Sequence, residues 1–310
     1  MIIDVHTHVG DLRGPDSMKR KPVSWSSLLQ RLDEEGIDKA VLLPIGCSPE
    51  SISFPSLFFP EASLVSQIKA ARRRSDRIIP FGNLDPRMGG AGNQKPEAGD
   101  KAVETDFSWI LERFLELGCS GVGEVTAHIP FDSPLTINMV RQCAAYGLAV
   151  LFHGSGPETG FYGLWDAIGS PRLERLLQAV PEATLIGHGP GFWAEISADL
   201  TPETKNTYPK GPVRQEGSLP RLLRRYKNLY ADISANSGHN AISRDRTYGV
   251  KFLNEFQDRI LLGTDVCYGD AEGRMPHLSY LRELLAQGAI SREVFDKITG
   301  SNAQKLLKVR

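Results

Sequence analysis

Histidine and acidic residues stand at the ends of several short apolar runs in this sequence. The residues in these positions are His6, His8, Glu124, His153, His188 and Asp265. Imidazole and carboxylate groups are the ligands that a borderline divalent ion such as zinc takes in proteins. Because alternate residues of a β-strand point to the same side, His6 and His8 can face one ion together. The six residues therefore predict a divalent-metal site, with zinc the expected metal and manganese the alternative.

Such a site indicates hydrolytic chemistry. A divalent ion lowers the pKa of a coordinated water toward about 7 and polarises a carbonyl oxygen, so a metal-bound hydroxide is available at neutral pH. Asp265 is the expected general base and acid, because a carboxylate beside metal and water can pass a proton to the leaving group. His188 would bind a second ion or polarise the scissile carbonyl. We therefore expect a hydrolase that cleaves a C–N or C–O bond of a small molecule, such as an amide, lactone or ester.

The apolar runs that precede these residues are continuous rather than alternating, which is typical of parallel strands buried on both faces. Eight such runs occur, at 2–6, 39–45, 78–84, 121–125, 148–153, 183–188, 229–234 and 260–265. Stretches with helical spacing lie between them, at 25–37, 62–74, 106–118, 171–180 and 277–288. This alternation predicts an α/β fold, a (β/α)8 barrel of the TIM type, with residues 1–310 forming a single domain. A doubly wound open sheet is less favoured, because the turn after the first run lacks a glycine-rich pattern.

A barrel also explains how residues far apart in the sequence can form one site. The carboxyl ends of all eight strands meet at one mouth of such a barrel, and the six candidate ligands stand at strand ends. Long inserts follow four of the strands, at 46–60, 85–104, 189–217 and 235–246. We expect these inserts to be irregular loops over the catalytic face.

The overall composition narrows the class of protein. Lysine and arginine number 36 against 37 aspartate and glutamate, so the net charge of −1 does not favour a nucleic acid as partner. No apolar run approaches the roughly 20 residues of a membrane span, and no leader-like segment opens the sequence, so a cytoplasmic location is expected. The four cysteines are far apart and are expected to be free thiols. The expected partner is a small-molecule substrate, and a homo-oligomer is open.

The motifs together resemble the amidohydrolase superfamily, and specifically its amidohydrolase-related branch, which also contains aromatic-acid decarboxylases. The resemblance rests on DVHTH, VLFHG, LIGHG, LLGTD and the terminal GSNAQKLL stretch. It implies that His6, His8, His153 and Asp265 bind a divalent metal and that His188 binds a second metal or the substrate. Many relatives place a carboxylated lysine between two metals at strand 4. This chain has Glu124 there, so the resemblance leaves one or two ions per chain open.

Several alternatives accompany this interpretation. The nearest is a metal-dependent nonoxidative decarboxylase of a small aromatic or unsaturated acid, which substrate-binding arginines such as Arg244 or Arg246 would favour. A barrel that only binds would be expected to lack a ligand or the base, and a nuclease or phosphodiesterase would want a basic face. The candidate substrate contacts are His239, Arg244 and Trp193, whereas His128 and His277 are expected to be exposed or in substrate loops.

Overall fold

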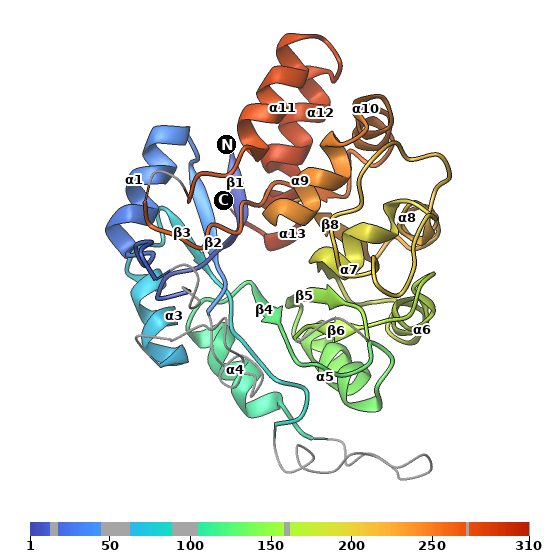
Figure 1. The fold of residues 1–310 in the computed structure, drawn as a ribbon. Helices are drawn as coiled ribbons and strands as arrows, with labels where there is room; N and C mark the ends of the chain where they lie inside the picture. Colours follow the sequence, from blue (N-terminus) through green and yellow to red (C-terminus); the bar gives the residue numbers. More distant parts are fainter. Residues whose placement is uncertain (13–17, 45–62, 89–104, 158–161, 271–272, 310) are drawn as a thin grey trace.

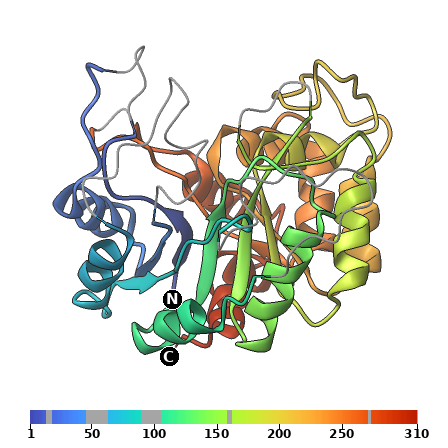
Figure 2. The same ribbon diagram turned by 90° about the horizontal axis from the view of Figure 1, so that it is seen from below.

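The computed structural model describes residues 1–12, 18–44, 63–88, 105–157, 162–270 and 273–309. Its strands form a ring with helices around the outside (Figures 1 and 2). The strands of the ring are β1 (Ile3–Thr7), β2 (Lys39–Leu42), β3 (Ile78–Pro80), β4 (Gly121–Val125), β5 (Ala149–Ser155), β7 (Leu185–His188), β8 (Leu229–Asp232) and β9 (Ile260–Leu261). All eight predicted strands are present. Most are shorter than predicted, mainly at their carboxyl ends, where β2 stops at Leu42, β3 at Pro80 and β9 at Leu261.

Two runs of parallel strands, β1-β2-β3 and β4-β5-β7-β8-β9, make up the ring. Gly82, just after β3, pairs with Val122 of β4, and this joins the first run to the second. At the other seam Val5 donates its N–H to the carbonyl of Leu262 at 2.8 Å, and Thr7 pairs with Val266. The strands therefore close into the (β/α)8 barrel that the sequence predicts.

A further two-residue strand, β6 (Leu164–Trp165), lies outside the ring. It pairs in parallel with the end of β5, where Gly154 faces Leu164. The sequence analysis did not predict it, because two residues are too few for a periodic signal.

Helices cover the outside of the ring. They are α1 (Trp25–Glu35), α3 (Leu64–Arg72), α4 (Ser108–Glu116), α5 (Pro134–Ala145), α6 (Pro171–Ala179), α8 (Ser218–Arg225), α10 (Arg246–Glu255), α11 (His277–Ala286), α12 (Arg292–Asp296), a π-helical segment at Lys297–Ser301, and α13 (Asn302–Leu307). The predicted helices are all observed, with ends that coincide with the prediction or fall one or two residues short of it. In α1, Ser24 and Ser27 form a capping box and Gly36 ends the helix in the left-handed conformation, with φ 69°. No described helix combines the length and the apolar character that a bilayer crossing would need.

Two of the predicted loops are partly helical, which corrects the expectation of irregular inserts. The 189–217 segment begins with α7 (Pro190–Trp193) and a 3₁₀ turn (Ala194–Ile196), and the 235–246 segment forms α9 (Ala235–Ser243). In α9 the buried residues are Ser237, Gly238, Ala241 and Ile242, mostly small side chains that give little hydropathic signal. The 46–60 insert lies outside the described residues, as does most of 85–104.

The core has an inner and an outer part. Strand residues such as Val5, Leu43, Phe81, Leu151 and Leu261 form one buried cluster with residues of α13, whereas the other, larger cluster joins strands to the surrounding helices. In a regular strand His6 would then point away from the side that Val5 occupies. The pairing register of β1 shifts between Asp4 and Thr7, and that of β4 shifts between Val122 and Val125. Irregularities of this kind re-aim side chains beside active sites, and here they fall at His6 and Glu124.

Candidate metal centre

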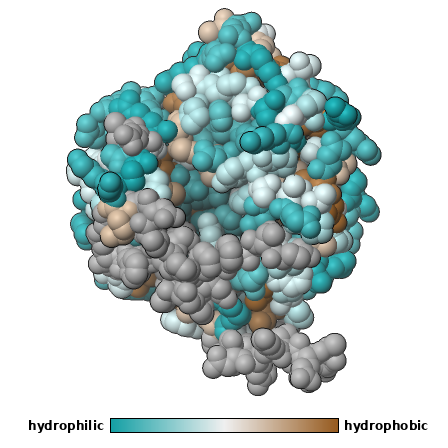
Figure 3. All heavy atoms as spheres, in the orientation of Figure 1, coloured by the Kyte–Doolittle hydropathy of each residue, from teal (hydrophilic) through white to brown (hydrophobic). Residues whose placement is uncertain are grey.

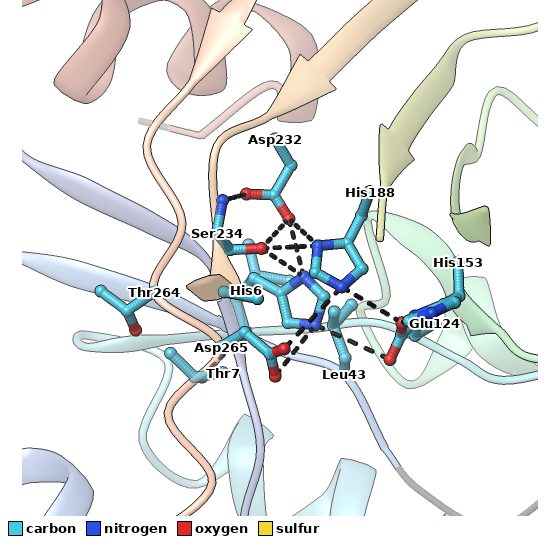
Figure 4. A network of polar contacts seen from close by, with 12 residues as sticks. His6, Thr7, Leu43, Glu124, His153, His188, Asp232, Ser234, Thr264 and Asp265 are labelled. Carbon is cyan, nitrogen blue, oxygen red and sulfur yellow. Dashed lines mark hydrogen bonds and ion pairs between the residues drawn. The ribbon is translucent and has the colours of Figure 1, made fainter. Parts of the chain in front are cut away.

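His6, His8 and Asp265 lie close together at the mouth of the barrel, and Figure 4 shows His6 beside Asp265. His6 Nε2 lies 3.1 Å from His8 Nε2, and the Asp265 carboxylate oxygen Oδ1 lies 3.2 Å from His8 Nε2 and 3.6 Å from His6 Nε2. These three residues offer ligand atoms within 4.8 Å of one another. The first and last strands of the barrel thus supply one potential metal-binding group.

Glu124 faces this group with one oxygen and a second pair of histidines with the other. Its Oε2 lies 3.7 Å from His6 Nε2 and 3.8 Å from His8 Nε2. Its Oε1 accepts a hydrogen bond from His153 Nδ1 at 2.7 Å and lies 3.6 Å from His188 Nε2. Since a carboxylate can bind an ion through each oxygen, Glu124 stands where a residue shared between two ions would stand.

Three motif residues place these side chains by their backbone geometry. Asp265 adopts a left-handed conformation, with φ 54°, and donates its N–H to the carbonyl of His6 at 2.9 Å. Gly189, directly after His188, has φ 97°, and a Cβ there would lie 2.8 Å from the carbonyl oxygen of Gly154. A Cβ at Gly263 would lie only 2.1 Å from the Asp232 carboxylate. The glycines of the H-G and G-T-D motifs are therefore required by close packing beside the site.

The outer nitrogens of three histidines are also held. His8 Nδ1 donates to the carbonyl of Leu43 at 2.9 Å, and His6 Nδ1 donates to Asp232 Oδ2 at 2.7 Å. His188 Nδ1 lies 2.8 Å from Ser234 Oγ. Asp232 and Ser234 were not among the predicted site residues, although both are polar residues at the end of the largely apolar run 229–234, a signal that could have identified them.

The ionisable groups of the cluster shift one another's pKa values, with a positively charged His6 between two carboxylates. Burial opposes a charged His6, but the carboxylates of Asp265 and Asp232 outweigh burial and raise the pKa of the ring well above its usual value. Burial would raise the pKa of Glu124, yet its hydrogen bond from His153 holds that pKa well below the usual value. Burial and repulsion from a protonated His6 lower the pKa of His188 to about 4. Without a metal, a proton on His6 Nε2 offsets the negative charge of the two carboxylates, whereas Nδ1 keeps the hydrogen that it donates to Asp232. A bound cation would take the place of the Nε2 proton.

The residues present fit a divalent ion. The donors are imidazole nitrogens and carboxylate oxygens, they are almost fully buried, and they come from five different strand ends. Among these side chains Asp265 is more exposed to solvent than Glu124 or His6: the exposed fraction is 18% for Asp265, 8% for Glu124 and 0% for His6. In the orientation of Figure 1, the space-filling view shows the surface hollowed near the middle of this face (Figure 3).

The three candidate substrate contacts each have partners of their own in the described structure. Trp193 is 1% exposed, packs against Phe192 and Phe252, and donates its indole N–H to the carbonyl of Asp232 at 2.8 Å. Its buried indole holds the end of β8 and offers no surface to a substrate. Arg244 donates to Ser197 Oγ at 3.0 Å.

The remaining histidines are packed against other elements. The ring of His239 in α9 lies 5.4 Å from that of His277 and 5.5 Å from that of Tyr280. His277, expected to be exposed or in a substrate loop, is fully buried and donates from Nε2 to the carbonyl of Ala235 at 2.9 Å. It corrects the sequence expectation because the start of α11 packs under α9. His128 is half-buried, and its Nδ1 donates to the carbonyl of Gly163 at 3.3 Å.

Two other side chains do approach the cluster. The ring of Tyr162 lies 4.4 Å from that of His153, and burial together with the charges of Glu124 and Asp265 raises its pKa well above the usual value. Cys267 Sγ donates to the carbonyl of Asp265 at 3.4 Å, and burial raises the pKa of this thiol. Both groups are therefore neutral polar neighbours of the metal-binding residues. Of the described cysteines, Cys119, Cys143 and Cys267 are free thiols, as predicted.

Comparison with known proteins agrees with this geometry. A family model described as amidohydrolase matches residues 3–309. The chain belongs to the amidohydrolase family. A search of curated proteins finds no match to this chain.

Solved structures of this family share the fold over nearly their whole length. A "probable 2-pyrone-4,6-dicarboxylic acid hydrolase" from Acinetobacter baumannii, with citric acid bound, is 15% identical, with a TM-score of 0.56 and coverage of 99% of both chains. The 2,6-dihydroxybenzoate decarboxylase from Rhizobium is 16% identical, with a TM-score of 0.54 and coverage of 99% of this chain and 98% of that one. The 5-carboxyvanillate decarboxylase from Novosphingobium aromaticivorans, complexed with manganese and a nitrobenzoic acid, is 12% identical, with a TM-score of 0.59 and coverage of 100% and 96%. At this identity the likeness establishes the fold and leaves the reaction to the site itself.

Proposed function

We propose that this amidohydrolase-family enzyme is a metal-dependent hydrolase that cleaves a C–N or C–O bond of a small amide, lactone or ester. The observation that carries the proposal is the placement of Glu124, whose two oxygens face His6 and His8 on one side and His153 and His188 on the other. A carboxylate with one oxygen toward each group of histidines could serve two divalent ions at once. Zinc is the proposed metal and manganese the alternative.

The six candidate ligands would bind two ions. His6, His8 and Asp265 would hold one ion, His153 and His188 a second, and Glu124 both. When bound, such ions polarise a carbonyl oxygen and acidify a coordinated water. The residues of the chain then have to orient the substrate, manage a proton and keep the ligands in place.

Asp265 is the residue that manages the proton. Its Oδ1 faces His8 and its Oδ2 lies 3.8 Å from His188 Nε2, so the carboxylate spans the cluster. Burial would raise its pKa, but the neighbouring His6 holds that pKa below the usual value, so the carboxylate is ionised and able to accept a proton. Its partial exposure gives it access to substrate from the hollow side. These features suit a general base that takes a proton from water and passes it to the leaving group.

Decarboxylation of a small aromatic or unsaturated acid is the second candidate, because two of the similar structures are named as decarboxylases. Binding of a carboxylate substrate is favoured by an unpaired cationic side chain near the metal-binding residues. Arg246 is engaged with Glu283 and Gln287 on the surface. Arg244 donates one nitrogen to the neutral hydroxyl of Ser197, and its buried Nε has no hydrogen-bond partner in the described part of the chain, so it is the arginine that would serve a decarboxylase. Hydrolysis is proposed first because of the placement of Glu124 between the two groups of histidines.

One experiment separates the two reactions. Chelator-stripped protein is reloaded with zinc or manganese, the bound metal is counted, and the loaded protein is offered panels of lactones, esters and amides beside hydroxybenzoic acids. The proposal expects about two metals per chain and acid release from the first panel. One metal per chain with carbon dioxide release from the second panel would replace hydrolysis with decarboxylation.

A further inference from the structure

Asp232 and Ser234 form a fully buried hydrogen-bonded unit behind the metal-binding histidines. Both side chains are 0% exposed. Asp232 Oδ1 accepts the backbone N–H of Ser234 at 2.9 Å, and Oδ2 accepts the Ser234 hydroxyl at 2.6 Å. Figure 4 shows this pair beside His6 and His188, on the side away from Glu124 and Asp265. The pair therefore touches two histidines without entering the space between the metal-binding atoms.

The number of hydrogens available for donation determines the direction of each hydrogen bond in this unit. A carboxylate only accepts hydrogen bonds, and a serine hydroxyl has one hydrogen to donate. Ser234 gives that hydrogen to Asp232, so toward His188 Nδ1, 2.8 Å away, its oxygen must act as acceptor. His188 consequently carries its hydrogen on Nδ1. Its Nε2 is left with a free lone pair, directed toward Glu124 and Asp265.

The hydrogen bond to Asp232 likewise determines which nitrogen of His6 carries hydrogen. Asp232 Oδ2, 2.7 Å from His6 Nδ1, can only accept, so Nδ1 carries a hydrogen and Nε2 is the nitrogen that faces the cluster. His8 is held separately, through the carbonyl of Leu43. The direction of the Ser234 hydroxyl thus determines which nitrogen of His188 carries hydrogen. The Asp232 carboxylate determines the direction of that hydroxyl and also the nitrogen of His6 that carries hydrogen.

We propose, building on the function proposed above, that Asp232 and Ser234 are positioning residues that lock His6 and His188 in the tautomer that binds metal and link the two halves of the metal centre. Ser234 Oγ lies 2.8 Å from His188 Nδ1 and 3.1 Å from His6 Nδ1, for which Asp232 Oδ2, at 2.7 Å, is the nearer acceptor. Ser234 therefore acts mainly on the half that contains His188, whereas Asp232 acts on both halves. Residues with this relation to a ligand histidine typically change metal affinity by 10- to 100-fold when they are removed.

The test compares Ser234→Ala with Ser237→Ala. Ser237, in α9, is also a buried serine, and its hydroxyl has no hydrogen-bond partner in the described part of the chain, so its removal controls for loss of a buried hydroxyl. Zinc titrated by calorimetry into each chelator-stripped protein gives stoichiometry and affinity. We expect Ser234→Ala to weaken one class of zinc site by 10- to 100-fold and Ser237→Ala to match the wild type.

A metal-free readout keeps this proposal separate from the function proposed above. Long-range ¹H–¹⁵N correlation spectra of the stripped proteins report which ring nitrogen of each histidine carries hydrogen. We expect the Nδ1–H form of His188 in the wild type and its loss or mixing in Ser234→Ala, with His8 unchanged. Asp232→Asn should disturb His6 and His188 together. An unchanged tautomer and unchanged zinc affinity in Ser234→Ala would refute the positioning role, whereas a single zinc equivalent in the wild type would refute only the two-ion hydrolase.

Discussion

The backbone N–H of Asp265 donates a hydrogen bond to the carbonyl oxygen of His6 at 2.9 Å, across the seam between the last strand and the first. This bond fixes the distance between a candidate base and a candidate ligand that lie far apart in the sequence. It also holds Asp265 in its left-handed conformation, with φ 54°. The backbone position of residue 265 therefore depends on the barrel itself and should be kept when the side chain is replaced.

The first prediction follows from that fixed position. Asp265→Asn keeps a coordinating oxygen in place but removes the charge that accepts a proton, so turnover should fall by about 10²–10⁴-fold, the typical contribution of a general base. Bound metal should be at least partly retained, as measured by elemental analysis beside the rate. Near-normal turnover would exclude Asp265 as the base.

The paired histidines of β1 give the second prediction. His6→Asn and His8→Asn each remove an imidazole that faces the other ring at 3.1 Å, so metal content and activity should fall together. The fold should persist, because the hydrophobic clusters lie elsewhere, and circular dichroism would verify this. A double variant that binds metal with wild-type stoichiometry would contradict the assignment of the site.

Glu124 supplies the third prediction. Glu124→Gln replaces one of two equivalent oxygens by a nitrogen that cannot bind a metal cation, so a shared ligand is lost. The metal count should drop from about two per chain to about one, and hydrolysis should collapse. Titration of zinc or manganese into the stripped proteins measures the count. A single equivalent in both wild type and variant would indicate that Glu124 is structural and would favour the decarboxylase.

The fourth prediction concerns stability. Lys205, 2% exposed, donates to the equally buried Glu195 at 2.5 Å, and Glu195 also accepts hydrogen bonds from Ser218 Oγ and the backbone N–H of Gly169. Lys205→Met leaves a buried carboxylate without its cation and should lower the free energy of unfolding by about 3–5 kcal/mol.

Urea denaturation tests this prediction with two comparisons. The exposed Lys210→Met variant should stay within about 0.5 kcal/mol of the wild type. Combining Lys205→Met with Glu195→Gln should recover part of the loss, because no unpaired charge is then left buried. Equal stability of Lys205→Met and Lys210→Met would show that the buried pair contributes nothing.

The sequence carried much information about the fold because parallel strands buried on both faces leave continuous apolar runs. All eight runs became barrel strands, and polar residues at their ends marked where the chain meets the mouth of the barrel. By contrast, α9 was hidden, because small residues such as Gly238 and Ala241 bury well but contribute little to a hydropathic period. Its packing depends on tertiary contacts with α7 and α10.

The candidate site was predictable to a similar depth. Residue types and strand ends singled out the six candidate ligands, but no local pattern shows that a serine such as Ser234 faces two histidines from other strands. Trp193 shows a different difficulty, since an aromatic residue in a loop over the barrel can bind substrate or pack inward, as the buried indole does here. Whether such a side chain packs inward or faces the substrate depends on how deeply its loop sits on the barrel, and that is a property of the whole fold.

The seam between β1 and β9 bears on the order in which the chain folds. Besides the backbone bonds there, Asp4 of β1 accepts hydrogen bonds from the N–H of Thr264 at 2.9 Å and from its hydroxyl at 2.5 Å. Contacts of such large sequence separation carry the highest cost in loop entropy and form late in folding. The ring closes only when the two ends of the chain meet, so His6 and Asp265 come together at that step. An ion held by both would then act as a cross-link of the closed barrel, stabilising it by about 2.7 kcal/mol at a free concentration 100 times its dissociation constant.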